Sequence, residues 1–236
     1  ERANVVLPII PQPKSVQVYD GSFVLDSMTQ MIFSTDEQKK VANYFNQELK
    51  KLAGFSCRIE LAPTEKKSIS FVQVDSLAIE AYLLDIGDTK ITLKASSEAG
   101  YFYAIQTLLQ LTPVGEKKIG KTVLKFDQLS IADQPRFIWR GALLDISRHF
   151  FGPEAIKKLI DQMAAQKMNR LHLHLTDDPG WRIEIKEYPK LTEIGSLGDR
   201  TNPNGPAMYL TEKEARDITA YANERQIMIV PEVDIP

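Results

Sequence analysis

Hydrophobic residues recur with two different spacings along the first half of the chain, one typical of strands and one typical of helices. Short runs rich in β-branched and aromatic residues predict strands at 16–19, 22–25, 30–33, 68–72, 81–85 and 90–94. The last two flank Gly87-Asp88, which predicts a hairpin turn. Apolar residues at helical spacing run from a possible capping box at Thr35 and Gln38 to Leu52, and a second helical pattern begins near Ser97. We expect a small α+β domain over residues 1–130, a sheet with two helices on one side that supports the rest of the chain.

The rhythm changes near residue 136, after a linker that we predict over 112–137 and that includes a short strand at 122–126. Beyond it, helical patterns separate strand-like runs at 140–146, 170–176 and 226–234. The run 140–146 is largely apolar, which is typical of a strand buried on both faces. Repeated βα units of this kind indicate a parallel barrel or a doubly wound sheet.

The segments between these strands carry further signals. Gly152-Pro153 opens the first helix, because a proline at the first helical position loses no hydrogen bond. Thr211 and Glu214 offer a capping box for the second helix. The loop between the second strand and the second helix, 178–211, has about 34 residues. This length is uncommon unless a loop is functional or holds small elements of its own.

Charged residues gather where each strand of the second half ends. The clusters comprise Asp145, Arg148 and His149 after the first strand, Asp177 and Asp178 after the second, and Glu232 and Asp234 after the third. The carboxyl ends of parallel strands meet at one end of an α/β fold, and ligands bind there. We therefore expect these residues to form parts of one site.

Composition narrows the classes of partner. A net charge of −2 gives no electrostatic reason for binding nucleic acid or an anionic membrane. The single Cys57 excludes an internal disulfide and a cysteine-based metal cage. No apolar run approaches the ~20 residues that span a bilayer.

Four segments together resemble glycoside hydrolase family 20, the β-N-acetylhexosaminidases. They read, in order, WRGALLDISRHF at 139–150, HLHLTDD at 172–178, GWRIEIK at 180–186 and VPEVD at 230–234. Four ordered motifs are far more specific than any one alone. The N-terminal half also resembles the small α/β domain that precedes the barrel in this family.

The resemblance implies a (β/α)₈ barrel that removes terminal N-acetylglucosamine or N-acetylgalactosamine from β-linked glycans. In this family the substrate's own acetamido oxygen attacks the anomeric carbon, and configuration is retained. An Asp-Glu pair assists: the aspartate orients the acetamido group and the glutamate acts as acid and then base. No metal or cofactor is implied, and the family habit is a secreted or periplasmic protein.

Carried over residue by residue, Arg148 matches an arginine that binds sugar hydroxyls at the non-reducing end, a task that suits its rigid fork of donors. Asp177 matches a buried aspartate whose charge helps to keep the catalytic glutamate protonated. We expect Arg140 to be structural, through a pairing with a carboxylate under the barrel. Supporting positions around the site are Asp145, His149 and Asp178, with Glu232 and Asp234 as weaker candidates.

Two features invite other interpretations. His172 and His174 lie on one face of a strand, an arrangement that metal-dependent barrels use. Such a site needs more ligands, and the third histidine, His149, lies at a different strand end, so we expect the pair to pack inside the barrel and bind no metal. Trp181 could stack on a sugar, but we expect it to be structural.

The departures from the family pattern limit what this chain can do. The Asp-Glu pair has no match here and is expected beyond Pro236. Residues 136–236 match three βα units, whereas a whole barrel needs ~250 residues. We predict that this chain alone has no turnover and that its open sheet exposes apolar edges. A non-catalytic carbohydrate-binding or assembly module that kept the Arg148 pocket is the alternative.

Overall fold

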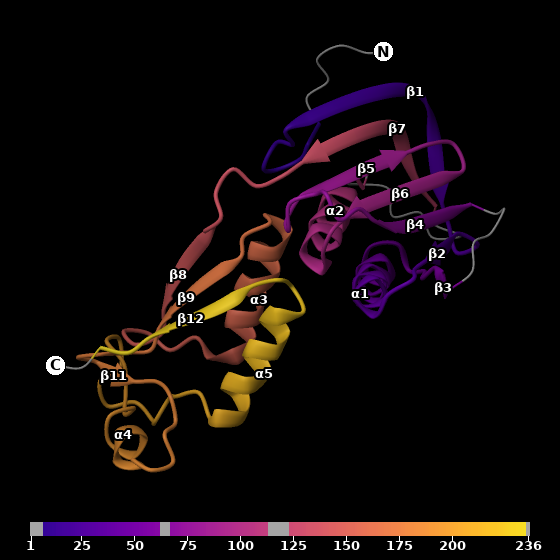
Figure 1. Cartoon of the computed structure of the whole chain (residues 1–236). Helices are drawn as coiled ribbons and strands as arrows, with labels where there is room; N and C mark the ends of the chain where they lie inside the picture. Colours follow the sequence, from indigo (N-terminus) through magenta and orange to yellow (C-terminus); the bar gives the residue numbers. More distant parts are fainter. Residues whose placement is uncertain (1–6, 62–66, 113–122, 235–236) are drawn as a thin grey trace. The chain divides into compact units, whose positions relative to one another are not determined.

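The structure, a computed structural model, describes residues 7–61, 67–112 and 123–234 (Figure 1). The chain divides into two compact units, Glu1–Arg136 and Phe137–Pro236, and each has a core of its own. No helix among the described residues has the length and apolar character required to cross a membrane.

The first unit is built on a mixed seven-stranded sheet in the order β1-β7-β5-β6-β4-β2-β3. Its strands are β1 (Ser15–Leu25), β2 (Gln30–Ile32), β3 (Arg58–Glu60), β4 (Ser68–Gln73), β5 (Tyr82–Ile86), β6 (Lys90–Ala95) and β7 (Leu124–Asp133). Pairing is antiparallel from β1 to β6 and parallel from β6 to β3. The predicted hairpin strands pair as β5 and β6, and the backbone N–H of Gly87 donates to the carbonyl of Lys90 in the turn.

Two helices, α1 (Asp36–Ala53) and α2 (Glu98–Gln110), pack against each other on the same side of this sheet (Figure 1). Each starts at a side-chain cap: the hydroxyl of Thr35 accepts from the backbone N–H of Gln38, and that of Ser97 from Gly100. The sheet with two helices on one side is therefore confirmed.

Three details of the predicted first half were wrong. The side chain of Gln38 accepts from the N–H of Ser34, not of Thr35, so the expected box is only half formed. Leu52 is 50% exposed because it lies outside the buried stripe of α1. Residues 124–126 of the short strand predicted in the linker are the beginning of β7, which lies inside the sheet between β1 and β5. The rest of that linker prediction at 113–122 lies outside the described residues.

The second unit contains a parallel three-stranded sheet in the order β12-β9-β8. Its strands are β8 (Gly141–Asp145), β9 (Arg170–His174) and β12 (Met228–Glu232), joined through α3 (Gly152–Ala165) and α5 (Glu212–Asn223). Both helices lie on the same side of the sheet and contact each other (Figure 1). Consecutive strands side by side, with both connecting helices on one face, make an open part of a parallel barrel, because a doubly wound sheet carries helices on both faces.

Strand β8 differs from its prediction. Leu143 is 58% exposed and Gly141 is also exposed, so the strand is not buried on both faces. The reason is topological: within the ranges that the structure describes, β8 pairs with β9 alone. The capping box of α5 is confirmed, with Thr211 and Glu214 bonding reciprocally.

The long loop between β9 and α5 holds small elements. A two-residue hairpin of β10 (Thr176–Asp177) and β11 (Gly180–Trp181) comes first, and the single turn α4 (Lys190–Glu193) follows. Asp177 and Asp178, the second polar cluster, lie on this hairpin directly after the end of β9. The loop therefore folds over the carboxyl end of the sheet, where the site was expected.

Candidate functional site

Strand register brings two of the predicted site residues, Asp145 and Glu232, into one row with His174. Asp145 on β8 aligns with His174 on β9, and His174 aligns with Glu232 on β12. Because side chains alternate along a strand, aligned residues point to the same face of the sheet. The row lies at the carboxyl ends of all three strands.

Arg148 is held beside this row by a tight turn after β8. The Oδ1 atom of Asp145 accepts from the backbone N–H groups of Ser147 and Arg148 at 2.9 and 3.0 Å, and its Oδ2 atom accepts from Nη1 of Arg148 at 2.7 Å. The Nη2 atom of Arg148 pairs with Asp177 on the β10–β11 hairpin. The guanidinium thus lies between two carboxylates, and its side chain remains 40% exposed.

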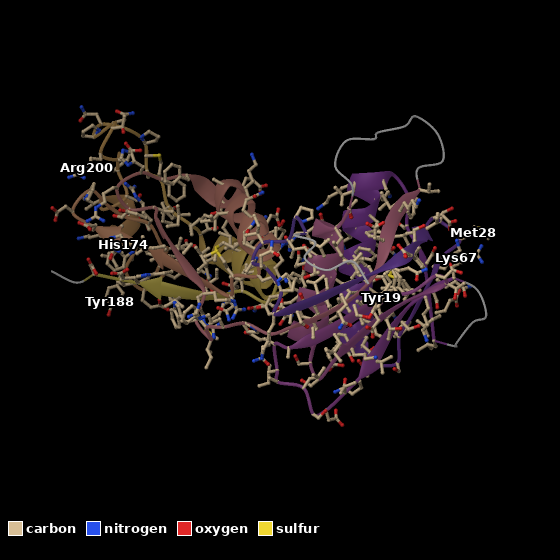
Figure 2. The ribbon with its side chains drawn as sticks, turned by 90° about the horizontal axis from the view of Figure 1, so that it is seen from above. Tyr19, Met28, Lys67, His174, Tyr188 and Arg200 are labelled. Carbon is tan, nitrogen blue, oxygen red and sulfur yellow. The ribbon has the colours of Figure 1, made fainter. Side chains whose placement is uncertain are left out.

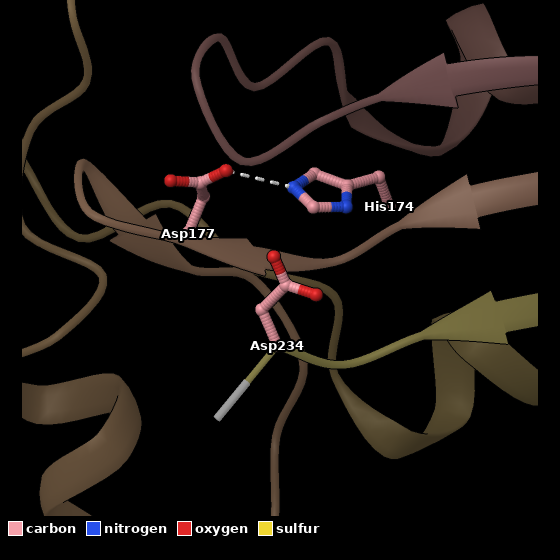
Figure 3. A group of neighbouring side chains, drawn as sticks. All are labelled: His174, Asp177 and Asp234. Atoms are coloured by element: carbon pink, nitrogen blue, oxygen red, sulfur yellow. Dashed lines mark hydrogen bonds and ion pairs between the residues drawn. The ribbon is translucent and has the colours of Figure 1, made fainter. Parts of the chain in front are cut away.

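His174 extends the network from Asp177 to the third strand. Its Nε2 lies 3.1 Å from Oδ2 of Asp177, and its Nδ1 lies 3.3 Å from Oε2 of Glu232. Glu232 also pairs with His172, which lies two residues before His174 on β9. Figure 3 shows His174 and Asp177 joined in this way, with Asp234 close to both.

These contacts shift the pKa values of the carboxyl groups around Arg148 downward. Burial raises the pKa of Asp145, but hydrogen bonds from Arg148 and from the backbone N–H of Ser147 outweigh it, and the pKa lies below its ordinary range. The pKa of Asp177 is lowered by the backbone N–H of Asp178 and by its charged neighbours. Both groups are therefore acceptors at neutral pH.

His174 and Glu232 shift in opposite directions. Burial opposes a charge on His174, yet the hydrogen bonds to Asp177 and Glu232 dominate and raise its pKa. Burial also raises the pKa of Glu232, but His174 and His172 bring it below its ordinary value. An imidazolium between carboxylates is the arrangement that these shifts favour.

The same cluster has ligand types that suit a cation. Atoms of His174, Asp177 and Asp234 lie within 4.8 Å of one another. However, Asp177 already pairs with the guanidinium of Arg148, and both ring nitrogens of His174 face carboxylates. A cation here would compete with the positive charge of Arg148, so the geometry fits a hydrogen-bond network better than a metal centre.

A buried arginine fixes the loop around this network, and the sequence analysis missed it. Arg182, next to β11, is 0% exposed. Its guanidinium donates to five backbone carbonyls, those of Ser147, Pro179, Ser196, Gly198 and Met208. These carbonyls come from the turn after β8, from the β10–β11 hairpin and from the long loop. One side chain therefore holds these three segments together.

Glycine is required where the hairpin approaches Arg182. A Cβ atom at Gly180 would lie 2.3 Å from the Cζ atom of Arg182, much closer than real contacts allow. The carbonyl of Gly180 also accepts from the hydroxyl of Ser147 at 2.7 Å. The hairpin therefore sits directly on the residue that precedes Arg148.

Two hollows flank the tip of the hairpin. One, of about 410 Å³, is lined by Arg148, Asp177, Asp178, Pro179 and Arg200. The other, of about 670 Å³, is lined mainly by apolar residues that include Trp181, Tyr188 and Ile194. Figure 2 shows His174, Tyr188 and Arg200 at the same end of this unit. We take the smaller hollow as the candidate site because the Arg148 network opens into it.

The structure brings most of the predicted site residues together. Arg148 contacts Asp145 and Asp177, and the network continues to Glu232, with Asp234 beside it. Asp177 is 18% exposed at its side chain, where the resemblance implied a buried aspartate. The roles of all these residues stay predictions.

Other predicted residues lie elsewhere. His149 contacts the long loop, where its Nε2 lies 2.8 Å from the hydroxyl of Thr201. Asp178 is exposed at the hairpin tip. His172 is 36% exposed and paired with Glu232, whereas His174 is buried, and the packing of both inside a complete barrel stays a prediction.

Two further residues of the predicted set have contacts that suit structural roles. Trp181 donates from its indole N–H to the carbonyl of Ile183 at 2.7 Å. Arg140 donates to the carbonyls of Lys167 and Phe137, at the opposite end of β8 from the site.

Comparison with known proteins agrees with this architecture. Residues 6–134 match glycosyl hydrolase family 20, domain 2, and residues 137–236 match the glycosyl hydrolase family 20 catalytic domain. A β-hexosaminidase of Porphyromonas gingivalis is 39% identical over 236 residues, which cover 97% of this chain and 30% of that protein.

Solved structures give the same result. The GH20 exo-β-N-acetylglucosaminidase from Vibrio harveyi, in complex with N-acetylglucosamine, has a TM-score of 0.87 at 34% identity, covering 100% of this chain and 38% of that one. The GH20 β-N-acetylhexosaminidase from Streptomyces coelicolor A3(2) has a TM-score of 0.88 at 31% identity, covering 97% and 46%. The chain thus spans less than half the length of each of these relatives. Since the domain 2 match alone covers more than half of it, this chain belongs to glycosyl hydrolase family 20.

Proposed function

We propose that the protein that contains this chain is a retaining β-N-acetylhexosaminidase. We further propose that the chain supplies the part of its active site that binds the terminal sugar. The observation that carries the proposal is Arg148, held between Asp145 and Asp177 with its guanidinium open to a pocket at the carboxyl ends of the strands. The names of the relatives, β-hexosaminidase and exo-β-N-acetylglucosaminidase, support the substrate class.

The proposed chemistry divides between this chain and residues outside it. Arg148 donates to hydroxyls of the terminal sugar, and its two carboxylate partners hold the guanidinium in a fixed plane. The substrate's acetamido oxygen is the nucleophile. A general acid needs a raised pKa, whereas the pKa values of Asp145, Asp177 and Glu232 are all lowered. We therefore place the proton donor, with its aspartate partner, in sequence that this chain does not include.

The test compares two proteins of verified intact mass on aryl β-N-acetylglucosaminides and β-N-acetylgalactosaminides. The full-length product of the gene that carries this chain is expected to release the aryl group, and the 236-residue chain is expected to release none. Turnover by the pure 236-residue chain would refute the division of roles. No turnover by the full-length product would refute the activity itself.

One observation favours a second candidate, a non-catalytic carbohydrate-binding module. Arg148 is held in place at its pocket, but the pKa values of Asp145, Asp177 and Glu232 beside it are all lowered, which does not suit a general acid. Binding of N-acetylglucosamine by the full-length product, without hydrolysis of either glycoside, would support this candidate instead.

Location outside the cytoplasm, secreted or periplasmic, belongs to the same proposal. It rests on the family habit alone. Fractionation of the producing cells, followed with an antibody against this chain, tests it.

A further inference from the structure

A second arginine lies at the mouth of the Arg148 pocket. The backbone N–H of Arg200 donates to the carbonyl of Arg148 at 2.9 Å, so the two residues are neighbours through their main chains. The adjacent pair, His149 and Thr201, is joined by a side-chain contact of 2.8 Å. Both arginines line the same hollow of about 410 Å³.

The loop that carries Arg200 is built rigidly. The Oδ1 atom of Asp199 accepts from the backbone N–H groups of Thr201 and Asn202, both at 2.8 Å. Gly198 has a φ of +67°, and a Cβ atom there would lie 2.4 Å from the carbonyl oxygen of Pro203. The carbonyl of Gly198 is also one of the five that Arg182 holds. The position of Arg200 at the pocket therefore follows from its backbone and does not depend on its side chain.

The two guanidinium groups differ in how they are used. Arg148 pairs with Asp145 and Asp177, which occupy part of its donor fork. Arg200 is exposed, and among residues 7–61, 67–112 and 123–234 its side chain has no hydrogen-bond or ionic partner. A guanidinium has five N–H donors, so those of Arg200 are available to a ligand.

The charge around Arg200 indicates the kind of ligand group. Asp177 and Asp178 line the hollow together with Arg148 and Arg200, so its four charges balance. A balanced set of donors and acceptors suits an uncharged hydroxylated ring better than an anionic substituent, because each sugar hydroxyl both donates and accepts.

We propose that Arg200 is a second sugar-binding residue, which donates to a hydroxyl of the same terminal N-acetylhexosamine that Arg148 holds. The inference rests on the proposed function and adds a residue that the motifs do not mark. Since a hydrogen bond to a charged group is worth about 1.5–3 kcal/mol, losing it corresponds to a fall in kcat/KM of roughly 10-fold to 150-fold.

The experiment uses the full-length product and the variants Arg200→Ala and Arg200→Lys. Each is measured on an aryl β-N-acetylglucosaminide and on its 3-deoxy, 4-deoxy and 6-deoxy analogues. Arg200→Ala is expected to raise KM on the parent glycoside, to lower its kcat/KM by the factor given above, and to have little effect on the one analogue that lacks the contacted hydroxyl. Arg200→Lys should restore part of the loss. Arg216→Ala, at an exposed arginine of α5, is the matched control. It should leave kcat/KM unchanged on the parent glycoside and on the three analogues.

Two results would overturn the inference. The first is unchanged kinetics of Arg200→Ala on every substrate that the wild type hydrolyses. The second is an equal loss on all three deoxy analogues, which would mean that the loop had merely been disturbed. If the wild type hydrolyses none of these glycosides, the proposed function fails instead. Calorimetric titration of N-acetylglucosamine into the wild type and Arg200→Ala then decides the inference, and equal affinities would refute it.

Discussion

Two arginines near the pocket have opposite surroundings and opposite tasks. Arg148 is partly exposed between carboxylates, while Arg182 is fully buried among carbonyls. The family resemblance pointed to Arg148 because it lies in a motif at a strand end. Arg182 also lies in one of the four motifs, GWRIEIK at 180–186, but the sequence does not indicate its partners: Ser147 and Met208 are 35 and 26 residues away, and they contribute only main-chain atoms. No side-chain pattern records such contacts, so they could not be predicted from the sequence.

We expect Arg182→Ala to destabilise the second unit by about 3 kcal/mol or more, because it leaves several buried carbonyls without donors and opens a cavity. Denaturant unfolding of the variant measures the loss. Arg216→Ala, at a 76% exposed side chain paired with Glu212, should stay within about 0.5 kcal/mol of the wild type. A similar loss in both variants would contradict the role that we give to the carbonyl cage.

The His174 network predicts a pH window for stability. The pKa of His174 is raised from 6.5, so its contribution is complete below that pH and is lost as pH rises through the raised value. The pKa values of Asp177 and Glu232 are lowered from 3.8 and 4.5, so their contributions are present above those values and are lost as pH falls. The network should stabilise the fold most between pH 4.5 and 6.5.

The variant His174→Gln tests this window. Its deficit in melting temperature relative to the wild type should be largest near about pH 5.5 and should shrink toward about pH 8.5. His149→Gln is the control, because His149 contacts Thr201 and lies outside the His174 network. A deficit of His174→Gln that grows with pH would contradict the assignment.

At the scale of elements, the sequence predicts a cap or a turn correctly wherever the residues in contact are close neighbours along the chain. The cap of α1 at Thr35, the box of α5 at Thr211 and the hairpin of β5 and β6 all appear as predicted. Strand β7 was predicted too short because Lys125, Asp127 and Gln128 interrupt its apolar pattern. It pairs with β1, about a hundred residues earlier, and with β5, and these two pairings explain why a strand with so many polar residues is extended.

The capping box of α5 gives a test at this scale. Thr211→Ala removes the hydroxyl that accepts from the N–H of Glu214, and we expect a loss of about 1 kcal/mol. Thr219→Ala, in the exposed middle of the same helix, should be neutral or slightly stabilising because alanine has the higher helix propensity. Chemical denaturation of both variants makes the comparison, and equal losses would exclude a specific capping effect.

At the scale of the whole molecule, the two units differ in how completely they bury their sheets. In the first, α1 and α2 cover a seven-stranded sheet, and buried residues such as Phe23, Phe45 and Leu84 fill the space between. In the second, β8 and β12 each pair with β9 alone within the described residues, and Leu143 remains exposed. The open edge agrees with the predicted consequence of three βα units without the remainder of a barrel.

We therefore expect residues 1–136, expressed alone, to form a folded monomer that unfolds cooperatively on heating, because that unit buries its own core. Residues 137–236, expressed alone, should self-associate through the open strand edges. Circular dichroism melting and light scattering on the two pieces make the measurement. A soluble, cooperatively folding second piece would show that its edges are better protected than this sheet order suggests.

The carbonyl cage of Arg182 also bears on how this loop can change during evolution. A carbonyl is the same in every residue, so the cage recognises the path of the main chain and not the side chains along it. Apart from Gly180, Gly195 and Gly198, where a Cβ atom would lie too close to its neighbours, exposed positions on this path can exchange residues while the loop keeps its course. Arg200 occupies such a position, so descendants of this chain can acquire a different sugar preference by a single substitution without rebuilding the wall that presents it.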